Sequence, residues 1–580
     1  LTPMVDFDFA AKSYAKNGVA VAFEDIFTYT RASSATFTNR RLKKNGGYEY
    51  SLDNDYVGSV TNNNISSENI DGAIYTITNG SSNLNVAIAP NGTKTADKII
   101  PNSNSGTHNI SQALPIVLGV TYIFSIYAKA EEYKFLQLFG GGGSQIKFAN
   151  FDLVNGVVSS GNFEGSNMYP SIKYDKNGWY RCSMTFTATA TTSTAVSFVA
   201  INNGSLSRNP VYTGDGLSGI LVWGAQFTQS AKALPYVKTL GVAVTKTFAE
   251  TLRTEYDAVT GENLGALIEG ASTNLALWSE DFSNAVWNKS SLTPTANAII
   301  APDGTLSGDL ITITVGSGHA LSQPITVIAS TQYAFSFYVK KGTATDLKYS
   351  VWDSTNLGNI VAPTSYFTEI GTDWTRISVT FTAPVGCTTA AIYPVRDSGV
   401  TGTAYIWGAQ CEVLPFASSY IRTEGSAVSR SSDDLRVASA GNFDADEYTI
   451  AIEGNTSGTS TTNTLLCVSD STNNNRLQLT TYTSKSFGYF TASGGSVQGF
   501  TGTGPVTKDT IKGVLTYTPN NLKGYFNGEL FSTDTSSLPL QNDNTIFIGN
   551  MNNTIERLFG HMGKVSIYAQ ALTAQEVTLL

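Results

Sequence analysis

The sequence has little charge, few cysteines and histidines, and no long hydrophobic run. Asp, Glu, Lys and Arg make up 14% of its 580 residues, against about 25% in a typical soluble protein. Four cysteines and three histidines form neither a disulfide framework nor a pattern of metal ligands. The longest apolar stretch, residues 113–128, contains Pro115 and Gly119 and is shorter than the roughly 20 residues of a membrane helix. We therefore expect no resident cofactor and no membrane insertion.

The residues that are abundant favour β-structure. Hydrophobic residues reach 41% and aromatic residues 11%, enough for several packed cores. Thr, Val, Tyr and Phe favour strands, while Asn and the 53 glycines favour tight turns. A net charge of −9 argues against a nucleic-acid partner bound through its phosphates. The first residues show no basic segment followed by an apolar run, so we also expect no secretory signal.

An internal repeat organises much of the chain. The run Trp223–Gln226 recurs as Trp407–Gln410, and the distance between partners is larger earlier in the chain, as loop insertions in the first copy would produce. The other matched pairs are Asn62 with Asn274, Glu68 with Glu280, His108 with His319, Gln112 with Gln323, and Trp179 with Trp374. One module therefore occurs twice, at about residues 61–240 (module 1) and 273–423 (module 2).

The strand pattern predicts an all-β, multidomain fold. In each module, aromatic-rich segments of alternating polarity, such as 121–127 and 332–338, predict two repeated antiparallel jelly-roll β-sandwiches. Residues 424–580 are also strand-like. There, Asn527-Gly528 predicts a hairpin, and Thr573 followed by Glu576 predicts a capped terminal helix. We expect a third sandwich in this region.

Several of these segments resemble known families. Residues 30–37 (TRASSATF) and 267–275 (LIEGASTNL) resemble the opening of many tailed-phage virion proteins, in which a carbohydrate-binding-module-like jelly roll follows. Residues 524–528 and 572–576 resemble the laminin-G-like, concanavalin-type sandwich. The resemblance therefore covers most of the chain.

The resemblance also predicts how the first part of the chain is divided. The two halves of the opening are usually close in sequence, but here Arg31 and Arg253 are separated by module 1. We expect that module 1 is inserted into a small split domain formed by residues 1–60 and 241–272.

The resemblance implies a role in a virion. The chain would be a tail fibre, tail-tip or capsid-surface protein, assembled as a homotrimer with other virion proteins, that attaches to host polysaccharide or lipopolysaccharide. Modules of this kind often hold a structural calcium ion, but no dense cluster of acidic residues is present. Two alternatives stay open: a purely architectural virion component, and a polysaccharide depolymerase.

Catalytic residues are not expected. His108 shares a strand face with Gln112, and His319 shares one with Gln323, which favours a structural hydrogen bond for each histidine. A glycosidase needs two carboxylates about 5–9.5 Å apart. The best candidates, the repeated Glu68 and Glu280, occur only once per module.

A glycan site needs an aromatic face that the fold itself does not require. The repeated tryptophans, Trp179 with Trp374 and Trp223 with Trp407, fit core positions. Trp352 aligns with the glycine loop of module 1 and shares a strand face with Ser350, opposite Val351. We predict that Trp352 forms a glycan platform with Asp353 and Tyr366, although a contact between domains or subunits fits equally well. Further candidates for ligand contact, in the third sandwich, are Asn474, Arg476 and Tyr489.

Overall fold

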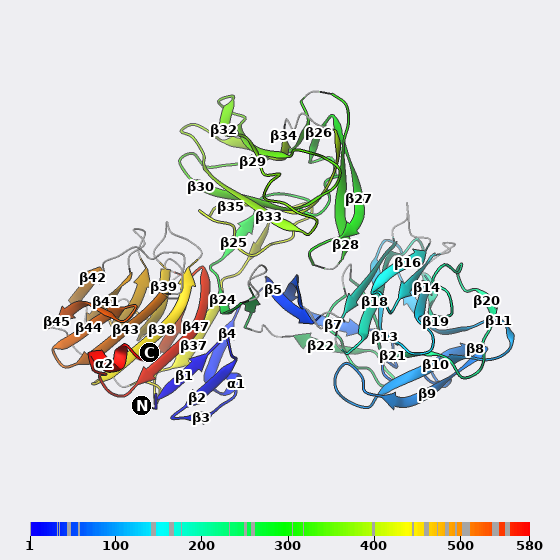
Figure 1. Cartoon of the computed structure of the whole chain (residues 1–580), viewed down its shortest axis with the longest axis horizontal. Coiled ribbons are helices and arrows are strands. Elements are labelled where there is room, and N and C mark those ends of the chain that lie inside the picture. Colours follow the sequence, from blue (N-terminus) through cyan, green and yellow to red (C-terminus); the bar gives the residue numbers. More distant parts are fainter. Residues whose placement is uncertain are drawn as a thin grey trace.

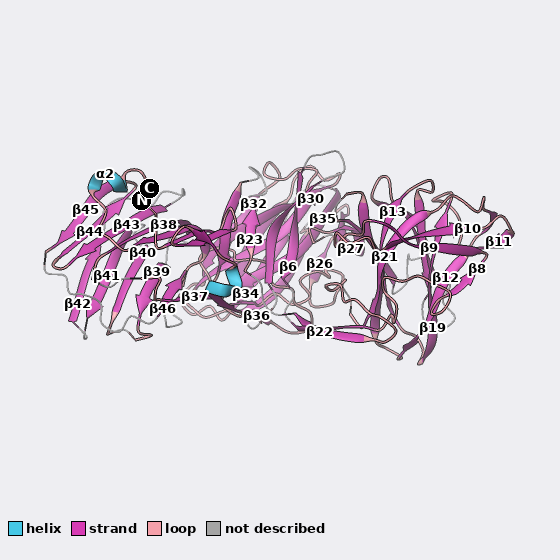
Figure 2. Cartoon of the chain, turned by 90° about the horizontal axis from the view of Figure 1, so that it is seen from below, coloured by secondary structure: helices cyan, strands magenta, loops and turns pink. Residues whose placement is uncertain are grey.

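The structure is a computed structural model. It describes residues 2–580 apart from 32, 34, 43–47, 56–57, 141–146, 162–167, 176, 231–232, 249–251, 257–261, 304, 317, 397–400, 444–445, 457–462, 473, 482–486, 494–495, 502–510, 536–544 and 551–556. The chain forms three β-sandwiches at the corners of a triangle (Figure 1), and nearly every described element is a strand (Figure 2). The all-β, multidomain prediction is confirmed. No described helix is long and apolar enough to cross a membrane.

Module 1 consists of two six-stranded antiparallel sheets. The first has the order β16 (Val157–Gly161), β15 (Lys147–Asp152), β14 (Phe135–Gly140), β19 (Thr192–Ile201), β12 (Asn109–Ile116), β8 (Thr76–Thr78). The second has the order β17 (Met168–Tyr174), β18 (Trp179–Thr187), β13 (Thr121–Ala130), β21 (Ile220–Thr228), β10 (Ala96–Pro101), β9 (Gly80–Ala87). A short pair, β11 (Ser105–Thr107) with β20 (Val211–Thr213), lies beside them.

Module 2 repeats this arrangement with five strands in each sheet. The first sheet has the order β26 (Asn288–Ser290), β29 (Ala320–Thr326), β34 (Thr389–Arg396), β31 (Lys348–Asp353), β32 (Gly358–Ser365). The second has the order β27 (Leu292–Ile300), β28 (Leu306–Ile313), β35 (Gly402–Glu412), β30 (Gln332–Lys341), β33 (Thr375–Thr382). The additional strands of module 1, β16 and β17, follow one another in the chain and extend one end of each sheet. The insertion in the first copy is therefore a pair of strands as well as loops.

The carboxyl-terminal sandwich contains a ten-stranded and a seven-stranded sheet. The larger has the order β3 (Val19–Ala20), β2 (Ser13–Lys16), β1 (Val5–Asp8), β47 (Gly560–Tyr568), β38 (Tyr448–Thr456), β43 (Ile511–Thr518), β44 (Asn521–Phe526), β45 (Glu529–Asp534), with β24 (Asn263–Ile268) and β23 (Thr254–Tyr256) also joined through β47. The smaller has the order β4 (Phe27–Thr30), β37 (Asp434–Ala438), β46 (Thr545–Ile548), β39 (Asn463–Ser469), β40 (Arg476–Thr481), β41 (Phe487–Ser493), β42 (Ser496–Thr501).

The remaining short elements connect the sandwiches or end the chain. They are α1 (Phe23–Ile26), the hairpin β5 (Ala35–Leu42) with β6 (Tyr48–Asp55), the pair β7 (Gly58–Asn62) with β22 (Val244–Phe248), and the pair β25 (Ser272–Asn274) with β36 (Val428–Arg430). The predicted hairpin at Asn527-Gly528 joins β44 to β45, with both residues at positive φ. The predicted cap of the terminal helix, α2 (Ala574–Val577), is present as a reciprocal capping box between Thr573 and Glu576.

The prediction that residues 1–60 and 241–272 form a small split domain is wrong for strands β1, β4 and β24. β1 pairs with β47, β4 pairs with β37, and β24 pairs with β47, so residues 5–30 and 263–268 complete the carboxyl-terminal sandwich. Their apolar side chains, including Phe7 and Phe27, are buried in the core of that sandwich. Burial of these side chains in the core shared by both sheets stabilises this pairing over a separate domain.

A buried network of arginines and carboxylates joins the amino-terminal segment, module 2 and the carboxyl-terminal sandwich. We call it the Arg joint. It consists of Arg31, Arg253, Arg430, Glu269, Asp433, Glu412, Ser418 and Ser419. The three positive and three negative charges balance, as buried charges require.

Asp433 and Glu269 are the centres of the Arg joint. Asp433 accepts hydrogen bonds from Tyr29 (2.5 Å) and pairs with Arg31 (3.2 Å) and Arg253 (2.5 Å). Glu269 pairs with Arg253 (2.9 Å) and Arg430 (3.2 Å). Each carboxylate is thus shared between two guanidinium groups that come from distant parts of the chain.

Acid should weaken the Arg joint. Burial raises the pKa of the Glu269 carboxyl, but the charges of Arg430 and Arg253 and hydrogen bonds from Ser419 outweigh burial and lower this pKa to about 2, from an ordinary value of 4.5. Because the folded pKa is the lower one, the ionised carboxylate stabilises the fold above about pH 4.5, and this contribution is lost as the pH falls towards 2. We expect urea unfolding at pH 3 to begin at lower denaturant than at pH 6. Glu269→Gln should be less stable at pH 6 and lose less stability than the native chain between pH 6 and pH 3; an unaltered dependence would contradict the assignment.

Candidate functional site

The repeated polar residues hold each jelly roll together. The Asn274 side chain donates to Ala409 O and Ile421 O and accepts from the N–H groups of Ala276 and Cys411. Asn62 makes the same four bonds in module 1, to Ala225, Val237, Asn64 and Phe227. Gln112 and Gln323 each accept a backbone N–H from the segment that follows the repeated asparagine. The asparagines thus tie the first segment of each module to its last strand, β21 or β35, and the glutamines tie the same segment to β12 or β29.

The repeated tryptophans brace loops from within each module. Trp179 and Trp374 donate from Nε1 to Ile88 O and Ile300 O. Trp223 and Trp407 donate to the hydroxyl groups of Thr95 and Ser307 and are buried. Trp179, Trp223 and Trp407 are buried and present no ring face to a ligand, and the half-buried Trp374 packs against Gly308.

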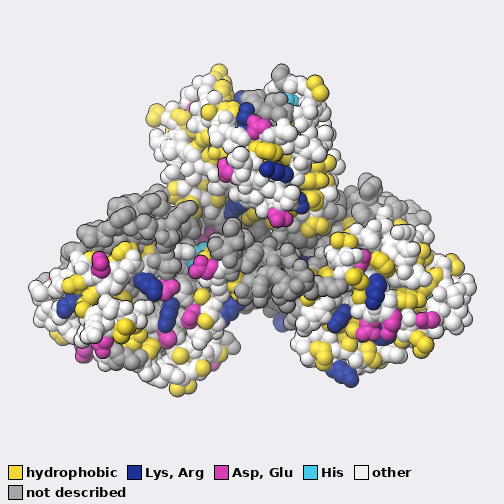
Figure 3. Space-filling model, in the orientation of Figure 1, with side chains coloured by type: hydrophobic (Ala, Val, Ile, Leu, Met, Phe, Trp, Pro, Cys, Tyr) yellow, Lys and Arg dark blue, Asp and Glu magenta, His cyan; other side chains and the backbone are white. Residues whose placement is uncertain are grey.

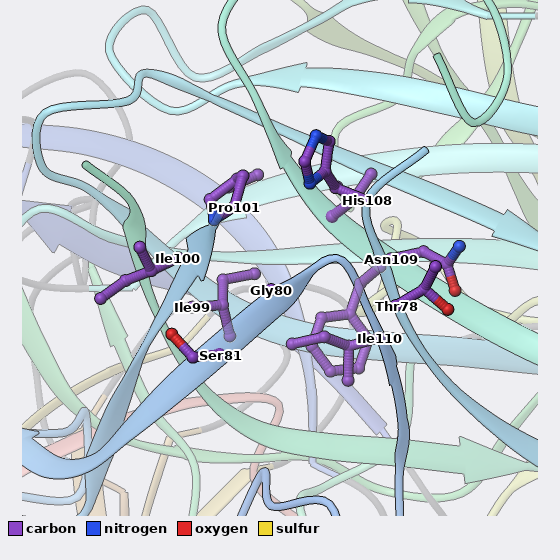
Figure 4. A pocket seen from close by; sticks show the side chains of 12 residues that line it. Thr78, Gly80, Ser81, Ile99, Ile100, Pro101, His108, Asn109 and Ile110 are labelled. Carbon is purple, nitrogen blue, oxygen red and sulfur yellow. The ribbon is translucent and has the colours of Figure 1, made fainter. Parts of the chain in front are cut away.

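The repeated histidines are buried and bonded to main-chain carbonyls. His108 lies between Asn79 O and Tyr212 O, at 2.5 and 2.9 Å, and His319 contacts Thr314 O at 2.9 Å. His108 also borders a small cavity between the two sheets of module 1 (Figure 4). The cavity measures about 20 Å³ and is lined mainly by apolar side chains such as Ile99. It has room for about one water molecule and none for a sugar ring.

Glu68 and Glu280 are in ion pairs. Glu68 accepts from Lys238 (2.6 Å) and from a tyrosine hydroxyl, and Glu280 pairs with Arg422 (3.2 Å). No group of three His, Cys, Asp or Glu side chains suited to a metal ion occurs among the described residues. A basic side chain thus neutralises each glutamate, so these residues do not fit the calcium ion that the family resemblance implies.

Trp352 lies on the outer face of the first sheet of module 2. Val351 points into the core, so the neighbouring Ser350 and Trp352 point outward, as the sequence predicts. Trp352 is half-buried and pairs across the sheet with Ala391, whose small side chain leaves the indole ring room to lie on the sheet. This side chain is therefore available to a ligand from one side.

The two expected partners of Trp352 point elsewhere, and this part of the prediction is wrong. Tyr366 is fully buried in the core of module 2, where its hydroxyl donates to Pro394 O at 2.9 Å. Asp353 is buried and caps the next turn, accepting from the N–H groups of Thr355 and Asn356. Tyr366 follows the end of β32, where strand alternation gives no guide to its direction.

Tyr393 and Arg396 are the residues that lie near Trp352 on the outer face of the first sheet. Both belong to β34, and Ser350 pairs with Tyr393 across the sheet. The Arg396 guanidinium lies 4.2 Å from the ring centre of Tyr393 and 5.7 Å from that of Trp352. The outer face thus combines two partly exposed aromatic rings with a cation beside both. The alternation of β34 around Ile392 could have identified Tyr393. It could not have identified Arg396, because the register shift between the pairs Leu321–Val395 and Gln323–Ile392 breaks the alternation and turns Val395 into the core.

In module 1 the matching face is covered. β14 lies beside β19 as β31 lies beside β34, and its outward side chains are Gln137 and Phe139, both buried. Residues 203–209 fold over them: Gln137 donates to Ser207 O, and Arg208 lies 4.9 Å from the ring centre of Phe139. The segment between β19 and β21 is longer than the one between β34 and β35, because part of it forms this cover. Module 2 is therefore the better candidate for ligand binding.

The candidates in the third sandwich do not form a site. Tyr489 is buried, with its hydroxyl 3.1 Å from that of Ser532, so the prediction of ligand contact is wrong for it. Asn474 is exposed in a turn, where its N–H donates to Thr472. Arg476 is half-buried at the start of β40. The structure does not bring these three side chains together around a common surface.

The comparisons with known proteins concern the carboxyl-terminal sandwich and the type of fold. A family model described as the concanavalin A-like lectin/glucanases superfamily matches residues 429–578, which confirms the predicted concanavalin-type sandwich. No curated protein matches the chain.

Similar solved structures include a CBM40 domain of a Ruminococcus gnavus sialidase bound to α2,3-sialyllactose (17% identity, 24% of this chain, 86% of that chain, TM-score 0.22). Another is a pentraxin from Limulus polyphemus (13% identity, 23% of this chain, 69% of that chain, TM-score 0.20). A third is domain 4 of a Geobacillus stearothermophilus arabinanase in complex with arabinotriose (14% identity, 28% of this chain, 80% of that chain, TM-score 0.22).

Proposed function

We propose that the chain binds glycans through the outer face of the first sheet of module 2. The observation that carries this proposal is the pair of half-buried aromatic rings, Trp352 and Tyr393, with the Arg396 guanidinium over both. The matching face of module 1 is covered by its own residues 203–209. Pyranose rings stack their C–H faces on flat aromatic surfaces, and a guanidinium can donate hydrogen bonds to sugar hydroxyls. Trp352 is then the stacking platform, and Arg396 orients the sugar through its hydroxyl or carboxylate groups.

We further propose that the protein is a virion component of a tailed phage that attaches to the polysaccharide or lipopolysaccharide of its host. The resemblance of residues 30–37 and 267–275 to phage proteins supports this role. Arg31 and Glu269 come from these two segments, and both belong to the Arg joint. A single sugar site is weak, and display of many copies on one particle, each a homotrimer, would raise the avidity without any new contact.

Binding of the full-length chain to an array of bacterial surface glycans tests the site. Trp352→Ala should reduce binding at least tenfold, because the stacking surface is lost. Tyr405→Ala is the matched control: Tyr405 is also half-buried and lies in module 2, but on the second sheet. We expect this variant to bind as the native chain does.

Two other outcomes would replace the proposal. Absence of glycan binding by the native chain would favour the purely architectural role. Release of reducing sugar ends from host polysaccharide, abolished by replacement of a single carboxylate, would instead identify a depolymerase. Binding that survives Trp352→Ala would show that the sugar site lies elsewhere.

A further inference from the structure

One end of module 2 carries exposed aliphatic side chains on three neighbouring loops. Ile328 is 68% exposed, Leu357 75% and Val385 86%. They follow β29, β31 and β33, respectively. We call these three side chains the apolar tip. Hydrophobic side chains are visible on the outer ends of the upper lobe in Figure 3.

Hydrogen bonds hold the three loops of the apolar tip together. Val327 N donates to Thr388 O at 3.0 Å, which joins the loop after β29 to the loop after β33. Thr388 N donates to Thr355 Oγ1 at 3.1 Å, which joins the latter to the turn after β31. The three side chains are thus presented by one connected structure.

The backbone at Leu357 argues that its exposure has a function. Leu357 has φ +58°, in the left-handed region that favours glycine. Module 1 forms the same kind of turn: Asp152 accepts from two successive N–H groups as Asp353 does, but Gly156 (φ +71°) occupies the left-handed position. In module 2 the leucine therefore has a strained backbone conformation, and its exposed side chain contributes little packing. Such strain is typical of functional positions.

The loops of the apolar tip are suited to leaving water. Residues 327–331, 354–357 and 383–388 include no charged side chain. Several of their backbone N–H groups are already bonded within the tip: Ser330 N to Ala383 O and Cys387 N to Pro384 O, in addition to those named above. Backbone groups that are satisfied internally can enter an apolar medium without the cost of unmade hydrogen bonds.

The composition of the apolar tip decides between possible occupants. A sugar would need an aromatic ring for stacking, and the tip has none. Protein interfaces favour Trp, Tyr and Arg over Leu and Val, and three side chains fall far short of the roughly 800 Å² per partner of a stable dimer. Leu, Ile and Val are the residues that partition favourably into hydrocarbon. We propose that the apolar tip inserts shallowly into a lipid surface. Because the tip has no charged side chain, this insertion does not require anionic headgroups.

Flotation of the full-length chain with phosphatidylcholine vesicles tests this proposal independently of glycan binding. Leu357→Gly should weaken vesicle binding at least tenfold. Glycine relieves the left-handed backbone, so the thermal midpoint should stay equal or rise, which separates lost binding from lost folding. The matched control is Val315→Ser, which alters another highly exposed aliphatic side chain (92%) of module 2. Val315 precedes the start of β29, whereas Ile328 of the apolar tip follows the end of this strand. This variant should bind vesicles as the native chain does.

Four results would overturn the proposal. One is that the native chain does not float with the vesicles. Another is that Leu357→Gly floats as well as the native chain, or that binding requires anionic lipid and disappears in high salt, as a charge-driven contact would. The last is that Leu357→Gly changes the oligomeric state in analytical ultracentrifugation, which would identify the apolar tip as a protein contact.

Discussion

Arg253→Ala is expected to lower the free energy of unfolding by about 3–5 kcal/mol, the usual cost of removing one partner from a buried ion pair. Arg253 donates to both Glu269 and Asp433, and all three side chains are buried. Without the guanidinium, both carboxylates lose a countercharge while they remain out of water. We expect the urea midpoint of the carboxyl-terminal sandwich to fall. Limited proteolysis should also cleave near the joint earlier than in the native chain.

Two variants make this result specific. Arg253→Lys keeps the charge but not the planar pair of donors, so it should be intermediate. Arg436→Ala removes an exposed arginine that pairs with Asp434 in the same sandwich, and it should cost less than about 1 kcal/mol. Equal losses in Arg253→Ala and Arg436→Ala would show that the Arg joint adds nothing beyond an ordinary surface pair.

Asn274→Ala should cost roughly 2–5 kcal/mol and affect module 2 alone. The variant removes two donated and two accepted hydrogen bonds at once and leaves the N–H groups of Ala276 and Cys411 buried without these partners. Asn62→Ala should do the same to module 1. In differential scanning calorimetry we expect each variant to shift one transition and leave the other module's transition in place.

The neighbouring residue provides the control. Thr273 bonds through its hydroxyl to Ser429 at an exposed position, so Thr273→Ala should change stability by less than about 0.5 kcal/mol. If Asn62→Ala and Asn274→Ala shifted the same transition, the two modules would unfold as one unit and the interpretation of independent repeats would be wrong.

Local patterns in the sequence predicted the features that depend on local physics. The Asn527-Gly528 hairpin and the Thr573 cap each depend on residues close together in the chain. The outward direction of Trp352 followed from strand alternation, which β31 obeys. The repeat predicted two equivalent sandwiches because matching residues meet the same partners in both, as Asn62 and Asn274 do.

Features that depend on distant pairing could not be predicted in this way. Tyr29 and Asp433 lie 404 positions apart, and no local pattern indicates that they meet. For the same reason, the first strands were assigned to a separate domain although β1 pairs with β47. The prediction of ligand contact fails for Tyr366 and Tyr489 because a tyrosine suits a ligand site as well as a core that offers its hydroxyl one partner.

The two ends of the chain lie side by side in the carboxyl-terminal sandwich (Figures 1 and 2), and this has a consequence for biosynthesis. The strands β1 and β4 leave the ribosome before modules 1 and 2, but their partners β47 and β37 are made after both modules. Until these partners are made, the apolar side chains of β1 and β4 lack their final packing, while modules 1 and 2 can already fold. A ribosome stalled after module 2 would therefore hold two folded jelly rolls and an aggregation-prone segment containing β1 and β4, without the partner strands β47 and β37. We expect chaperones to bind this segment during synthesis.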